Sequence, residues 1–180
     1  MVLYSISDRR IRSFLKNGVI MDTSVILDIM EGLIHTQRKS VDTIGWKAKY
    51  DKIINLLQLL KIYNNWGRYF FTPHILTETC SHINKDYNDG KDFEDIVKNI
   101  MYIVRLSQEK NVSKKEFIDC INYCPNMDLE PGDLSIYVTA DCFAQQKEKI
   151  SILTIDDGFI KRYGASPYVM VINYKLVDIK

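Results

Sequence analysis

Short apolar runs alternate along the chain with segments in which apolar residues recur every three or four positions. We expect the apolar runs to be buried strands, near residues 19–22, 69–72, 150–154 and 168–172. The periodic segments predict helices over residues 23–32, 47–65, 73–83, 93–108, 114–123 and 133–147, with a short one after Asp156 and Asp157. Strands that are apolar throughout and alternate with helices indicate an α/β fold whose parallel sheet is covered on both faces.

The 180 residues suit one domain better than two, and 46% of them are apolar, which is enough for a sizeable core. We expect a single domain over residues 1–180. Its core should span about residues 18–172, preceded by an N-terminal extension over residues 1–17 and interrupted by a helical insertion over residues 33–68.

The charges of the chain nearly cancel, with 24 Lys and Arg against 23 Asp and Glu, so affinity for nucleic acid must come from local patches. Residues 36–70 carry seven basic and two acidic side chains. Candidate contacts to nucleic acid there are Lys47, Lys49, Lys52 and Arg68. The aromatic residues interleaved with them are Trp46, Tyr50, Tyr63 and Trp66. They could stack on the bases of RNA, or they could be core residues of an amphipathic helix, and the pattern leaves both interpretations open.

The N-terminal residues do not have the pattern of a secretory signal, because Asp8, Arg9, Arg10 and Arg12 interrupt them. The apolar-rich stretch over residues 53–63 is too short to span a bilayer. We therefore expect a cytoplasmic protein with no membrane contact. The four cysteines do not have the spacing of a zinc site.

Four acidic residues stand where strands end or helices begin. Asp22 ends the first strand, Asp156 follows the third, and Glu78 and Asp133 lie in early turns of helices. The carboxyl ends of parallel strands meet at one edge of a sheet, where functional groups gather. Four carboxylates there would repel one another, and one or two Mg²⁺ or Mn²⁺ ions would compensate. We also expect the helix start to lower the pKa of Asp133.

These acids lie in four motifs that together resemble those of the PIN-domain family. The motifs are Val19 to Leu27 with Asp22, Thr72 to Glu78, Asp133 to Ala140, and Ile152 to Phe159 with Asp156. The resemblance covers most of residues 18–172, and its specificity comes from the order of the four motifs rather than from any one of them.

The resemblance implies a three-layer α/β/α sandwich and a metal-dependent endoribonuclease that cleaves single-stranded or structured RNA with a metal-activated water. The implied metal ligands and catalytic residues are Asp22, Glu78, Asp133 and Asp156. Ser24 and Thr154 are the implied supporting hydroxyls, Thr154 to orient Asp156 and Ser24 to hold a metal-bound water. Asp157 is a further candidate, since one of the Asp156–Asp157 pair should cap the helix while the other binds metal, and spacing favours Asp156 as the ligand.

Many members of the family are toxins of type II toxin–antitoxin pairs, so an antitoxin protein is an implied partner. The N-terminal extension and the insertion depart from the pattern of the small toxins. The alternative is a non-catalytic PIN-like protein that binds RNA or acts as a scaffold, which would usually lack one or more of the acids. Tyr63, Trp66 and the apolar face over residues 53–62 also predict a homodimer.

Overall fold

A computed structural model describes residues 9–39, 45–86, 91–123 and 130–177. Its centre is a five-stranded sheet in the order β3-β2-β1-β4-β5, in which every neighbouring pair is parallel. The strands are β1 (Val19–Met21), β2 (Tyr69–Phe71), β3 (Gln108–Glu109), β4 (Ile150–Thr154) and β5 (Val169–Asn173). The predicted α/β fold with a parallel central sheet is confirmed.

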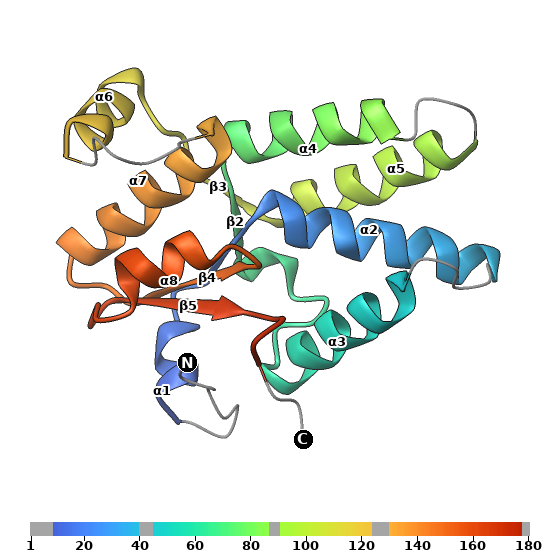
Figure 1. Ribbon diagram of the computed structural model, residues 1–180, viewed down its shortest axis with the longest axis horizontal. Helices are drawn as coiled ribbons and strands as arrows, with labels where there is room; N and C mark the ends of the chain where they lie inside the picture. Colours follow the sequence, from blue (N-terminus) through green and yellow to red (C-terminus); the bar gives the residue numbers. More distant parts are fainter. Residues whose placement is uncertain (1–8, 40–44, 87–90, 124–129, 178–180) are drawn as a thin grey trace.

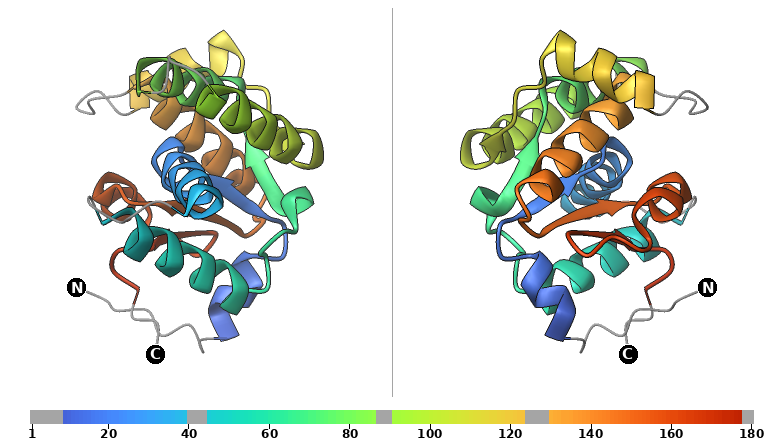
Figure 2. Two further views of the ribbon diagram at one scale, coloured as in Figure 1. Left: turned by 90° about the vertical axis from the view of Figure 1, so that its right-hand side faces the viewer. Right: turned by 90° about the vertical axis from the view of Figure 1, so that its left-hand side faces the viewer.

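Helices connect the strands. They are α1 (Arg9–Phe14), α2 (Thr23–Arg38), α3 (Trp46–Leu59), α4 (Pro73–Asp86), α5 (Lys91–Leu106), α6 (Lys114–Tyr123), α7 (Pro131–Gln145) and α8 (Asp157–Tyr163), with a 3₁₀ turn, η1 (Trp66–Arg68), before β2. Because parallel crossovers are right-handed, α2 to α5 cover one face of the sheet and α7 and α8 cover the other. The result is a three-layer α/β/α arrangement, in which α1 lies at the end of the molecule opposite α4, α5 and α6 (Figures 1 and 2).

The register of the strands brings their carboxyl ends to one level. Ile20 pairs with Phe70 on one side and Ile152 on the other, and Leu153 pairs with Ile172. Backbone hydrogen bonds continue just past the strands, from Asp22 to Leu153 and from Tyr174 to Thr154. The residues that follow β1, β4 and β5 therefore stand side by side at one edge, called here the carboxyl edge.

The predicted insertion contributes to the core of the protein. Ile53, Leu56 and Leu57 of α3 are fully buried, and Leu60, Ile62 and Trp66 after it are nearly so. These residues hold α3 against α2. The apolar face from which we predicted a homodimer thus lies inside the molecule, so that argument for association is wrong.

Two elements were missed by the periodicity. β3 is an edge strand of two exposed polar residues, so no apolar run marks it. α1 spans six residues, and its anchors Ile11, Phe14 and Leu15 lie in and just after it, in the predicted N-terminal extension. Among the described residues, no helix combines the length and hydropathy needed to cross a membrane.

We predict that Leu57→Ala lowers the free energy of unfolding by about 2–5 kcal/mol, because it opens a cavity beneath α3. Leu59→Ala is the matched control two residues away. Leu59 is 45% exposed, so its truncation should cost less than about 1 kcal/mol. Urea denaturation measures both, and equal losses in the two variants would contradict the packing of α3 into the core.

Candidate functional site

Four helices begin near one another at the carboxyl edge. α2 follows β1, α4 follows β2 and α8 follows β4, while α7 begins there before it returns to β4. Figure 1 shows these four starts gathered near the centre of the molecule. The positive ends of four helix dipoles and their unpaired backbone amides therefore face the region that holds the acids.

Asp22 is held in place by two hydroxyl groups. Its Oδ2 accepts hydrogen bonds from Ser24 Oγ at 2.7 Å and from Thr154 Oγ1 at 2.6 Å. Thr154 Oγ1 in turn accepts from the backbone amide of Asp156 at 2.9 Å. Asp22 stands at the N-cap position of α2, where the backbone amides of Ser24 and Thr23 act to lower its pKa against the larger effect of burial. Ser24 donates its hydroxyl proton to Asp22, and the expected contact of Ser24 with a metal-bound water stays a prediction.

Asp156 both caps a helix and faces the other acids. Its Oδ1 accepts from the backbone amide of Gly158 at 2.8 Å, which closes the first turn of α8. Asp157 accepts from the side-chain amide of Asn173 at 3.0 Å. Asp156 is thus the acid of the pair that caps the helix, although spacing favoured it as the metal ligand, and its role as a ligand stays a prediction.

Asp133 lies at the centre of the acidic residues. Burial raises its pKa to about 7, and the negative charges of Asp22, Asp156, Glu78 and Glu130 contribute to the increase, in that order. We expected the start of α7 to lower this pKa, and that expectation is wrong. Desolvation and four neighbouring carboxylates outweigh the helix dipole, which contributes about 0.3–1 kcal/mol.

Glu78 reaches the same region from the second turn of α4. Burial raises its pKa, and Glu130 and Asp22 raise it further. Its carboxylate lies directly against Gly132, since a Cβ atom on Gly132 would stand 1.8 Å from Glu78 Oε2. Position 132 must therefore be glycine for Glu78 to occupy this place.

A chain of buried hydrogen bonds fixes α4 against α7 at this point. The amide of Ile75 donates to Thr72 Oγ1, as expected for an N-cap at Thr72. Thr72 Oγ1 and Ser135 Oγ are 2.6 Å apart, and Ser135 Oγ donates to the carbonyl oxygen of Gly132 at 2.6 Å. Because each hydroxyl has one proton, Thr72 is the donor to Ser135. The chain holds Gly132 beside the helix that carries Glu78.

Three neighbours of the acids were missed in the sequence. Glu130 raises the pKa of Asp133 and Glu78, and only its place beside Pro131 could have drawn attention to it. Gly132 has no side chain and therefore gives no chemical signal in the sequence. The buried hydroxyl of Thr23 lies close to the Glu78 carboxylate and acts to lower its pKa, against the larger effect of burial. No motif indicates any of these roles.

The chemistry of these side chains fits a hard divalent cation. All of the donors are carboxylate or hydroxyl oxygens, which Mg²⁺ and Mn²⁺ prefer. Burial raises the pKa of Asp22 and of Glu78, and a nearby cation would reverse that effect by favouring the charged forms. As placed in the described segments, no three His, Cys, Asp or Glu side chains come close enough to hold a metal ion. The carboxylates are thus neighbours that do not yet converge on one point.

The four candidate basic residues separate into two groups. Lys47, Lys49 and Lys52 lie on α3, with Lys49 Nζ 3.8 Å from Asp28 Oδ1. Arg68 comes just before β2, at the opposite edge of the sheet, where its guanidinium donates to the carbonyl oxygens of Leu15 and Lys16. Arg68 therefore lies apart from the acids and contacts the segment after α1, and its binding to nucleic acid stays a prediction.

The tryptophans of the same region are core residues. Trp46 and Trp66 are both buried, and Trp46 stacks on His35 with ring centroids 5.0 Å apart. Tyr50 is half-buried against Gly32, and Tyr63 is 36% exposed. The core interpretation therefore holds for the tryptophans, which cannot stack on bases.

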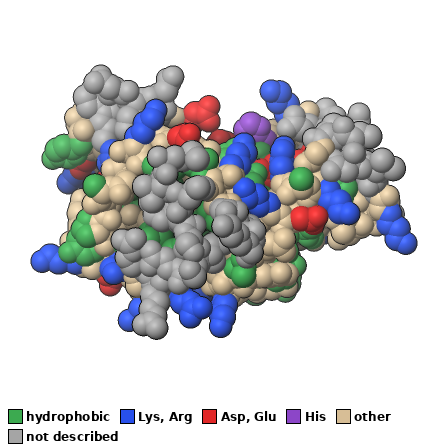
Figure 3. Space-filling view, turned by 60° about the horizontal axis from the view of Figure 1, so that its bottom comes forward, with side chains coloured by type: hydrophobic (Ala, Val, Ile, Leu, Met, Phe, Trp, Pro, Cys, Tyr) green, Lys and Arg blue, Asp and Glu red, His purple; other side chains and the backbone are tan. Residues whose placement is uncertain are grey.

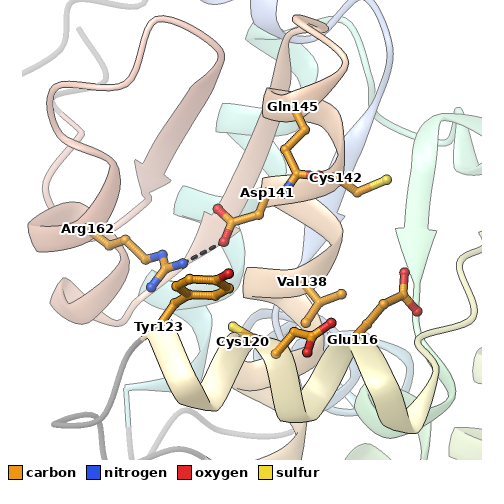
Figure 4. A pocket seen from close by; sticks show the side chains of 9 residues that line it. Glu116, Cys120, Tyr123, Val138, Asp141, Cys142, Gln145 and Arg162 are labelled. Carbon is orange, nitrogen blue, oxygen red and sulfur yellow. Dashed lines mark hydrogen bonds and ion pairs between the residues drawn. The ribbon is translucent and has the colours of Figure 1, made fainter.

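A cavity of about 480 Å³ lies elsewhere, between α6, α7 and α8 (Figure 4). Its lining includes Glu116, Asp119, Asp141 and Arg162. Asp141 pairs with Arg162 and accepts from Tyr163, so its charge is already balanced. The four acids of the carboxyl edge do not line this cavity, which is separate from the candidate site.

We predict that Asp133→Asn stabilises the protein in EDTA, and more so at higher pH. The raised pKa means that the folded state binds this proton more tightly than the unfolded state, so wild-type stability falls as pH rises from about 4 to about 7. At pH 8 the variant should gain about 1–3 kcal/mol, less than the full shift implies because water screens a half-buried group, and at pH 4–5 the gain should shrink. Chemical denaturation at both pH values, with the exposed Asp119→Asn as control, measures it. A gain that does not depend on pH would contradict the raised pKa.

Comparison with known proteins identifies no relative of this chain. No protein-family model matches the chain, and searches of curated proteins and of solved structures find no significant match.

Proposed function

We propose that the protein is a metal-dependent endoribonuclease that cleaves single-stranded or structured RNA, with metal ligands Asp22, Glu78, Asp133 and Asp156. The observation that carries the proposal is that the other three acids lie close enough to Asp133 for their charges to raise its pKa. They come from four separate elements, so no local motif requires them to meet. An antitoxin partner and a homodimer stay predictions.

The energetic cost of the arrangement supports a cation-binding role. Asp22 and Asp156 stand at N-cap positions, but Asp133 and Glu78 lie within their helices, where capping does not explain them. Placing carboxylates together in a partly buried position destabilises the fold unless a ligand offsets their repulsion. A divalent cation offsets it and requires the same oxygen donors.

The side chains can divide the work of phosphodiester hydrolysis. A divalent cation in this position would lower the pKa of a water molecule and neutralise charge on the phosphate. Thr154 and Ser24 hold the carboxylate of Asp22 in one orientation. Gly132 leaves room for Glu78, and the helix starts direct backbone amides towards the region where an anionic substrate would lie.

We predict that the protein cleaves a mixed pool of single-stranded RNA in the presence of Mn²⁺ or Mg²⁺, and that EDTA abolishes cleavage. Asp22→Asn should lower the rate at least 100-fold, because it removes a charged ligand while its side-chain oxygen can still accept from Ser24 and Thr154. Gel electrophoresis of end-labelled RNA measures the rate, and circular dichroism checks the fold.

Glu148→Gln is the matched control for this assay. Glu148 is exposed and precedes β4, at the edge of the sheet opposite the acids, so its loss should leave the rate unchanged. Equal cleavage by wild type, Asp22→Asn and EDTA-treated protein would exclude the metal mechanism. Absence of cleavage, with no Mn²⁺ binding by calorimetry, would favour the non-catalytic scaffold.

We further predict that Gly132→Ala weakens Mn²⁺ binding by about 10- to 100-fold, the range for changes beside metal ligands. The new methyl group would displace the carboxylate of Glu78, although alanine itself suits the helix. Isothermal titration calorimetry measures the affinity. Gly67→Ala, where a Cβ would meet only a carbonyl oxygen at 3.5 Å, is the control.

The double variant separates this displacement from a general effect. In a Glu78→Ala background the added methyl group has no carboxylate to displace, so Gly132→Ala should change the affinity little. An equal loss in the presence and absence of Glu78 would contradict the positioning role of Gly132.

A further inference from the structure

The turn that follows β5 joins the acidic site to the insertion helix α3. On the acidic side, the side-chain amide of Asn173 donates to the carbonyl oxygen of Ile155 at 3.1 Å and to Asp157 Oδ1 at 3.0 Å. Asn173 Oδ1 accepts from the backbone amide of Lys175 at 3.0 Å. Asn173 is buried, so these bonds hold the turn firmly against the loop that carries Asp156.

The other side of the same turn is bonded to α2 and α3. Lys52 Nζ donates to the carbonyl oxygen of Lys175 at 2.8 Å. The hydroxyl of Tyr174 donates to Asp28 Oδ2, and Lys49 Nζ lies near the other oxygen of Asp28. Lys49, Lys52 and Lys175 therefore surround one turn, at a fixed place beside the acids. Figure 3 shows several Lys and Arg side chains on the face that it presents, with acidic side chains among them.

The lysines of α3 lie on two different flanks of the helix. At 100° per residue, Lys49 and Lys52 lie about 60° apart on the flank that meets the turn. Lys47 and Asp51 lie about 40° apart on the other flank. Lys47 thus has an acid for a neighbour, while the acid nearest to Lys49, Asp28, already accepts a hydrogen bond from Tyr174.

We propose that Lys49, Lys52 and Lys175 bind the phosphates of the RNA strand next to the phosphodiester held by the four acids. This inference rests on the proposed function, because it takes the acids as the place of cleavage. Lysine ammonium groups are mobile point charges that suit phosphates at variable positions. Trp46 and Trp66 are buried, so neither tryptophan can stack on a base at this surface.

A substrate that reaches α3 must be longer than one that fills only the acidic site. The contribution of the three lysines should therefore grow with the length of the RNA. A role in folding alone would affect short and long substrates equally, so substrate length distinguishes the two explanations.

The first test is binding in EDTA by the Asp22→Asn protein, which separates affinity from cleavage. The triple variant Lys49→Gln, Lys52→Gln and Lys175→Gln should bind a fluorescent 20-nucleotide single-stranded RNA at least tenfold more weakly at low salt. The slope of log affinity against log salt should fall by about 2, since each phosphate contact to a single strand contributes about 0.7. Single-stranded DNA and duplex RNA of the same length are compared in parallel, and tighter binding of either would overturn the assignment to an RNA strand.

The control triple variant removes the same number of positive charges, but at the edge of the sheet opposite the acids and in the last turn of α8. It is Lys16→Gln, Lys147→Gln and Lys161→Gln, all at exposed positions. It should bind as the parent does. The single variant Lys49→Gln, which leaves the bond of Lys52 to the turn intact, should show about one third of the change in slope and guards against a folding defect in the triple.

The second test measures cleavage in Mn²⁺ and uses protein that keeps the native Asp22. The lysine triple should lower kcat/KM at least tenfold on the 20-nucleotide RNA and leave it unchanged on a trinucleotide. Equal effects of the two triples, or no RNA binding by the parent, would overturn the proposal. If RNA is cleaved and both triple variants behave alike, the nuclease proposal is supported and the proposed role of the three lysines is wrong. If no RNA is cleaved but only the variant of Lys49, Lys52 and Lys175 loses binding, the role of the lysines is supported and the nuclease proposal is wrong.

Discussion

Thr154 connects the two central strands at the point where both end. Its buried hydroxyl donates to Asp22 after β1 and accepts from the amide of Asp156 after β4. Strand pairing brings the two ends together, but only this side chain determines how the two acids face each other. Ser24 adds a second bond to the same oxygen of Asp22, so the carboxylate has little freedom to rotate. Asp22 and Asp156 are therefore the fixed pair of acids beside which Asp133 and Glu78 are placed.

Around that pair, partly buried carboxylates occupy positions that would be apolar in an ordinary core, and their repulsion destabilises the fold. The pKa of Asp133 rises because burial and four neighbouring carboxylates act in the same direction, and no described lysine or arginine pairs with it. Elsewhere the protein does pair its half-buried acids, as Arg162 and Tyr163 do for Asp141. Charge compensation is therefore available to this fold, but none of the described residues provides it for Asp133. That contrast within one molecule is the physical basis for treating the acids as a functional cluster.

Sequence patterns predicted what depends on neighbours along the chain. Asp22 and Asp156 were identified because each follows an apolar run. What failed depends on contacts between distant segments. The need for glycine at position 132 arises from Glu78 on another helix, and the burial of Trp46 arises from His35. The pKa of Asp133 was predicted in the wrong direction because a local dipole was visible in the sequence, whereas the burial of the side chain, the largest cause of the increase, was not.

The order in which the chain is synthesised has a bearing on when these acids can act. Asp22 and Thr154 are separated by 132 residues, and the pairing of β1 with β4 spans nearly the same interval. When Asp22 and Glu78 have been synthesised, the ribosome must still add many tens of residues before β4 is complete. Contacts of such long range form late and slowly. Until then the nascent protein carries isolated carboxylates, and a nuclease built this way would stay inactive towards the messenger that encodes it.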